Sequence, residues 1–75
     1  MNQHTEAVID AMHRAGSNIE GNDEGEIAYY LRDWFTDPMY EDEAAPWIAA
    51  NLPCWVNFGQ VNWAEVARNV QGVSA

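Results

Sequence analysis

Residues 24–36 carry the pattern that most restricts what this chain can fold into. Their apolar positions recur at the spacing of one helix face: Ile27, Leu31, Trp34 and Phe35, with Tyr30 at the margin. Asp23, followed three residues later by Glu26, matches a capping box, which is a start signal for a helix. Pro38 disfavours helical geometry at Asp37 and marks the end. The spacing therefore predicts a helix over residues 24–36 that buries one face.

The N-terminal segment predicts a helix over residues 6–15. Its apolar side chains gather on one side: Val8, Ala11, Met12 and Ala15, widened by Ile9. We expect Thr5 to cap the start of this helix and Gly16 to end it. His4 and His13 are expected at exposed helix positions.

Two further helices are predicted towards the C-terminus. One lies within residues 42–51, where Pro46 either opens the helix or interrupts it. The other spans residues 63–71 and precedes Gly72, and its start carries a capping box and a hydrophobic staple: Asn62 with Glu65, and Val61 with Val66. Residues 52–60 are too short for a sheet of their own. The expected fold is all-α, a small compact bundle of about four short helices in a single domain over residues 1–75.

The charge balance restricts the partners of this chain. Twelve Asp and Glu residues oppose three Arg residues, and there is no Lys, so the formal net charge is −9. Nine of the twelve acidic residues lie within residues 20–43, where Arg32 is the one basic residue. This balance argues against direct binding to nucleic acid or to an anionic membrane. A basic protein surface is the expected partner, because opposite charge speeds encounter and disfavours wrong partners.

On a helical wheel, Glu26, Asp33 and Asp37 fall within about 40° of one another, and their axial spacings are roughly 10 and 6 Å. These spacings are comparable with those between phosphates on a nucleic-acid strand. We therefore expect an acidic ridge that presents carboxylates where a DNA-binding protein expects phosphates. The predicted contact set is Asp23, Glu24, Glu26, Asp33, Asp37, Glu41, Asp42 and Glu43. The alternative is a solvated face that only keeps the protein soluble.

A family resemblance points the same way. The sequence Glu-Ile-Ala-Tyr-Tyr-Leu-Arg-Asp-Trp at residues 26–34, the acidic stretch after it, and Val-Asn-Trp-Ala-Glu-Val-Ala-Arg at residues 61–68 resemble segments of ArdA-type antirestriction proteins. The resemblance covers about residues 26–70. ArdA proteins are longer DNA mimics encoded by phages and plasmids. The resemblance implies a mobile-element inhibitor that occupies the DNA-binding groove of a host defence nuclease, either a restriction enzyme or a CRISPR effector.

The sequence predicts no catalytic, metal or cofactor site. Glu20, Asn22, Glu24 and Gly25 partly match the spacing of a calcium-binding loop, but Leu31 stands where the bidentate carboxylate belongs. The two His residues and Cys54 lack zinc-ligand spacing. We expect Cys54 to be a small buried hydrophobe. The lone cysteine and the lack of a signal peptide or membrane span favour a cytoplasmic protein.

The aromatic residues suggest an alternative function. We expect Trp34, Phe35 and Trp63 in the core, whereas nine aromatic side chains exceed what so small a core hides. One or two of the remaining rings are therefore expected to form an exposed patch, from Tyr29, Tyr40, Trp47 and Trp55; the predicted hydrophobic contact is Tyr40, Trp47 and Trp55. Under this alternative the chain is a structural or adaptor module that binds through a Trp-rich surface. A homodimer is compatible with either function.

Overall fold

A computed structural model of the chain describes residues 1–17, 19 and 23–71. Four α-helices follow one another: α1 (Gln3–Arg14), α2 (Glu24–Thr36), α3 (Glu41–Asn51) and α4 (Trp63–Val70). Two short 3-10 turns, η1 (Pro38–Tyr40) and η2 (Phe58–Gln60), precede α3 and α4. The only β-type pairing in the described residues is an isolated bridge between Ile19 and Gln71. The predicted all-α fold of four short helices is confirmed.

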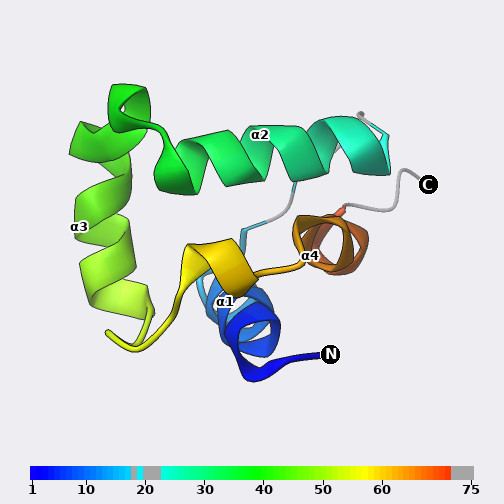
Figure 1. The fold of residues 1–75 in the computed structure, drawn as a ribbon, viewed down its shortest axis with the longest axis horizontal. Coiled ribbons are helices and arrows are strands. Elements are labelled where there is room, and N and C mark those ends of the chain that lie inside the picture. The colour runs from blue at the N-terminus through cyan, green and yellow to red at the C-terminus, as the bar shows by residue number, and fades with distance from the viewer. Residues whose placement is uncertain (18, 20–22, 72–75) are drawn as a thin grey trace.

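The helices cross one another rather than run side by side in one direction (Figure 1). In this view α2 lies across α1 and α4, which are seen nearly end-on, and α3 stands at the end of α2. The most extensive packing joins α2 to α4, and α1 packs on α4 from the other side. Because η1 contacts both α2 and α3, the end of α2 and the start of α3 meet at one corner of the molecule.

The core lies where α1, α2 and α4 meet. Its buried members come from α1, α2 and α4 and from the segment between α3 and α4: Val8, Ile9, Ala11, Met12, Ile27, Leu31, Phe35, Leu52, Val61, Val66, Ala67 and Val70. The single face predicted for residues 24–36 supplies three of them. This agreement follows from periodicity, since a stripe at helical spacing can be buried only on the side facing the other helices.

Phe35 is the centre of an aromatic cluster within this core. Its ring lies 5.0 Å from that of Trp34, 5.6 Å from that of Trp47, 5.3 Å from that of Phe58 and 5.4 Å from that of Trp63, measured between ring centroids. Phe35 is buried and the other four rings are partly buried around it. The predicted core position of Phe35 is therefore confirmed, whereas Trp34 and Trp63 pack against the core and are only partly buried.

The local start and stop signals work as the sequence predicts at three places. The side chain of Asp23 accepts a hydrogen bond from the Glu26 N–H at the start of α2. Asn62 does the same for the Glu65 N–H at the start of α4. Gly16, at φ +71°, ends α1 in the left-handed conformation that glycine adopts without strain. Gly72 lies outside the described residues.

Two details of the first predicted helix are wrong. The first helix begins at Gln3, because Asn2 rather than Thr5 caps it by accepting from the Thr5 N–H at 2.8 Å. Ala15 follows α1 and is exposed. Of the two alternatives left open for Pro46, the structure excludes a place in the first turn, since the proline lies inside α3. This position is tolerated although proline has no N–H with which to bond the carbonyl four residues earlier.

Candidate functional site

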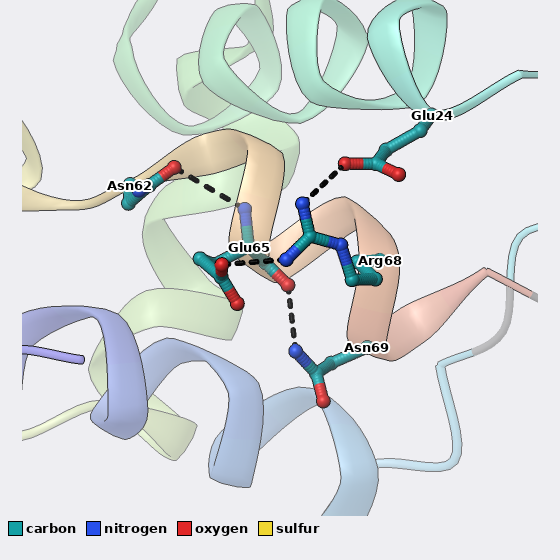
Figure 2. A network of polar contacts seen from close by, with 5 residues as sticks. All are labelled: Glu24, Asn62, Glu65, Arg68 and Asn69. Carbon is teal, nitrogen blue, oxygen red and sulfur yellow. Dashed lines mark hydrogen bonds and ion pairs between the residues drawn. The ribbon is translucent and has the colours of Figure 1, made fainter.

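The first acidic residues of the predicted contact set have structural partners. Asp23 caps α2, as described above. Glu24 Oε1 accepts a hydrogen bond from Arg68 Nη2 at 3.1 Å, and Arg68 Nη1 donates at 2.6 Å to Glu65 Oε1 (Figure 2). Arg68 thus links the start of α2 to α4, and this link partly neutralises Glu24.

The same network raises the pKa of Arg68. Its hydrogen bond to Glu24, assisted by the negative charges of Glu24 and Glu65, raises the pKa of Arg68 above its already high ordinary value. The guanidinium is therefore charged at every physiological pH. Asn69 adds a hydrogen bond from its side-chain amide to the carbonyl of Glu65 at 2.8 Å (Figure 2). Arg68 is committed to this contact, so it does little to offset the remaining acidic residues.

Glu26 and Asp33 are brought together along α2. Both line one depression of the surface, which Asp23 also lines. Asp33 is 3.8 Å from Arg32, a long and partly exposed ion pair. Glu26 has no ion pair among the residues that the structure describes. Exposed pairs of this kind contribute little, so the negative charge of this face stays largely uncompensated.

The predicted ridge does not continue to Asp37. The helix ends at Thr36, and Asp37 has an extended backbone with ψ 128°, so the helical wheel no longer places its side chain. Its carboxylate instead accepts a hydrogen bond from the Met39 N–H at 2.9 Å and caps η1. Asp37 and Glu41 line a second depression, distinct from that of Glu26.

Glu41, Asp42 and Glu43 form the first turn of α3, and all three are exposed. No side chain caps this helix, and the N–H of Glu41 donates to the Pro38 carbonyl instead. Negative charge near a helix N-terminus is stabilising by about 0.3–1 kcal/mol per group. A structural role therefore explains where these residues stand. It does not explain why basic residues are missing around them.

The predicted hydrophobic contact is not one surface. Trp47 is partly buried, with its ring 6.0 Å from that of Trp34, so its expected place in an exposed patch is wrong. Tyr40 belongs to η1 before α3, whereas Trp55, 51% exposed, follows the end of α3. Trp55 is thus left as the exposed tryptophan of this set, and its ring lies 5.7 Å from that of His4.

Cys54 is exposed, and the prediction that it is buried is wrong. The chain turns at this point, and Leu52 is the side chain that enters the core instead. His4 is half-buried rather than exposed: its Nδ1 accepts from the Asn57 N–H at 3.0 Å. His13 is exposed as expected, and its Nε2 lies 2.8 Å from the carbonyl of Asn69. Both histidines therefore tie α1 to the C-terminal half of the chain.

Metal-ligating side chains do not gather anywhere in residues 1–17, 19 and 23–71, where no three of His, Cys, Asp and Glu are placed to share an ion. Glu20 and Asn22 of the partial calcium-loop match lie outside the described residues. None of the helices in the described part of the chain has the length and apolarity that a membrane span requires.

Tyrosines line the depression that Glu26 and Asp33 share. The sequence predicted Tyr29 and Tyr40 as candidates for a hydrophobic contact, whereas Tyr30 was expected at the margin of the buried stripe and its place in a site was missed. Glu26, Tyr29, Tyr30 and Asp33 share one face of α2, because they stand at positions i, i+3, i+4 and i+7. This spacing is visible in the sequence and could have grouped the tyrosines with the two carboxylates.

Comparison with known protein families, with characterised proteins and with solved structures found no match.

Proposed function

We propose that this chain is an acidic inhibitor that mimics DNA and blocks the basic nucleic-acid-binding groove of a host defence nuclease. The observation that carries the proposal is the concentration of acidic residues in α2 with its cap, in η1 with its cap and in the first turn of α3, a stretch that we call the acidic face. Eight carboxylates belong to this stretch, with Arg32 as its one basic residue: Asp23, Glu24, Glu26, Asp33, Asp37, Glu41, Asp42 and Glu43. The resemblance of residues 26–70 to ArdA-type antirestriction proteins supports the same class.

The dimensions of this face suit the proposal. The thirteen residues of α2 extend over about 20 Å, which is close to six base-pair steps of duplex DNA. The corner at η1 adds the acidic residues of α3 beyond the end of that helix. No chemical step is needed, because a bound inhibitor excludes DNA by occupying its site. The association is expected to weaken with ionic strength, since its driving charges are exposed.

The proposal is tested by capturing a partner and asking whether DNA releases it. Immobilised protein is mixed with a lysate of the host cells at low salt, and the bound proteins are eluted with either a salt gradient or duplex DNA. We expect a DNA-binding nuclease that leaves at moderate salt and is displaced by the duplex. A partner that resists salt and ignores DNA would contradict the proposal.

A second candidate function is an adaptor that binds protein through the loop after α3. The exposed ring of Trp55 lies in this loop. Its chain neighbours Cys54 and Val56 line a groove without charged residues, together with residues of α3. Under this alternative, Trp55→Ala removes binding and charge neutralisation leaves it intact. Trp47 no longer supports the adaptor function, because it packs against the core.

A further inference from the structure

One depression on the acidic face combines rings with carboxylates. It has a volume of about 480 Å³ and lies between α2 and η1. Three tyrosines and three acidic residues line it, together with Gly25: Tyr29, Tyr30 and Tyr40, and Asp23, Glu26 and Asp33. A face that only keeps a protein soluble has no use for tyrosine rings at this density, since exposed aromatic surface favours association.

The rings are placed so that their surfaces remain available. Tyr29 is 63% exposed and Tyr30 is 49% exposed. The ring of Tyr30 meets that of Tyr40 in an edge-to-face arrangement, with centroids 6.5 Å apart. This contact joins α2 to η1, so two of the three rings hold each other in place.

The molecule itself shows what one of these rings binds. The guanidinium carbon of Arg32 lies 4.8 Å from the centre of the Tyr29 ring, within the range of a cation–π contact. Arg32 does not line the depression, and its ion pair with Asp33 is long, at 3.8 Å. Glu26 has no ion pair among the described residues, so it is available to a second cation. A planar guanidinium suits such a site better than an ammonium, because it stacks on a ring while its N–H groups bond a carboxylate in a fork.

We propose that this tyrosine-lined depression receives an arginine side chain of the basic partner. The occupant follows from charge complementarity with the three carboxylates and from the stacking surface of the rings. The inference rests on the proposed function for the identity of the partner, but the binding chemistry can be measured without that partner. Specific recognition of arginine would add to the non-specific attraction between opposite charges.

The test compares acetylated hexa-arginine and hexa-lysine peptides for binding to the intact chain, by calorimetry at 150 mM NaCl and by NMR shift mapping. We expect hexa-arginine to bind more tightly, by about two- to fivefold for each ring engaged. The largest shifts are expected at Tyr29, Tyr30 and Tyr40. Equal affinities, or shifts centred on residues 41–43, would overturn the inference.

Single substitutions test which residues make hexa-arginine bind more tightly than hexa-lysine. Tyr30→Leu is expected to remove the preference for arginine while the carboxylates keep a salt-dependent affinity for both peptides. Tyr29→Leu is a second variant at a more exposed position, in case the first disturbs the contact with Tyr40. Trp55→Leu is the matched control, since its ring is equally exposed but lies away from α2, and it should keep the preference.

The outcome separates this inference from the proposed function. If the peptides show no arginine preference but a DNA-binding partner is captured and released by DNA, the inference fails and the function stands. If the preference is present but no such partner is found, the function fails and the arginine site stands.

Discussion

The replacement Thr5→Val tests how α1 is joined to α4. Thr5 is fully buried, and its Oγ1 accepts a hydrogen bond from the Asn62 N–H at 2.9 Å, at the residue that caps α4. Valine has nearly the same shape but no acceptor, so the Asn62 N–H loses its partner in a contact that is buried on the Thr5 side. An orphaned buried donor costs about 1–3 kcal/mol.

This cost is large for so small a protein. At typical values per residue, a 75-residue chain has a free energy of unfolding of about 4–11 kcal/mol. In a domain of this size, each 1 kcal/mol shifts the melting temperature by about 4–8 °C. Thr5→Val should therefore lower the melting temperature by about 4–24 °C, measured by circular dichroism or calorimetry.

The same substitution at an exposed threonine is the control. Thr36 donates from its hydroxyl to the Arg32 carbonyl at the solvent-exposed end of α2, so Thr36→Val should change the free energy of unfolding by no more than about 0.5 kcal/mol. Equal melting temperatures for the two variants would refute the reasoning, because burial of the Thr5 hydrogen bond would then not add to the free energy of unfolding.

Three other predictions concern the core, the charge and the thiol. Phe35→Ala should cost about 3–5 kcal/mol in urea unfolding because it empties the centre of the aromatic cluster, whereas the exposed Tyr29→Ala should cost far less; similar losses would contradict the cluster. The melting temperature should rise between 10 and about 300 mM NaCl because salt screens the repulsion within a chain of net charge −9, and a fall would show that local attractions such as Glu24 with Arg68 dominate. Cys54 should react fully with a thiol reagent without denaturant, and a reaction that needs unfolding would contradict its exposure.

Local signals made the helices predictable. The Asp23 cap, the stripe from Ile27 to Phe35 and the stop at Pro38 all act within a few residues of one another, so the sequence alone places α2 at its observed bounds. The cap at Asn62 acts in the same way for α4.

Contacts between segments that are distant in the sequence could not be predicted from such local signals. Thr5 is an acceptor for Asn62, 57 residues away, and so carries no local mark of its role. Trp47 is drawn towards Phe35 by the way α3 meets α2, and Cys54 turns outward at the end of the same helix. At the candidate site, the acidic positions could be read from the sequence. The turn at Asp37 that separates its carboxylate from those of Glu26 and Asp33 could not be read in that way.

A comparison of two charge-matched variants with wild-type protein tests the central claim most directly. Glu26→Gln, Asp33→Asn and Asp37→Asn together remove three negative charges from the acidic face, and asparagine can still cap η1 at Asp37. The control removes the three acidic residues that lie outside residues 20–43: Glu6→Gln, Asp10→Asn and Glu65→Gln.

The dissociation constant of each variant for the captured DNA-binding partner is then measured at one low salt concentration. Since both variants lose the same net charge, any difference between them reports where the charge lies. The account predicts clear weakening for the acidic-face variant and near wild-type affinity for the control. Equal affinities for the two variants would contradict DNA mimicry by this face.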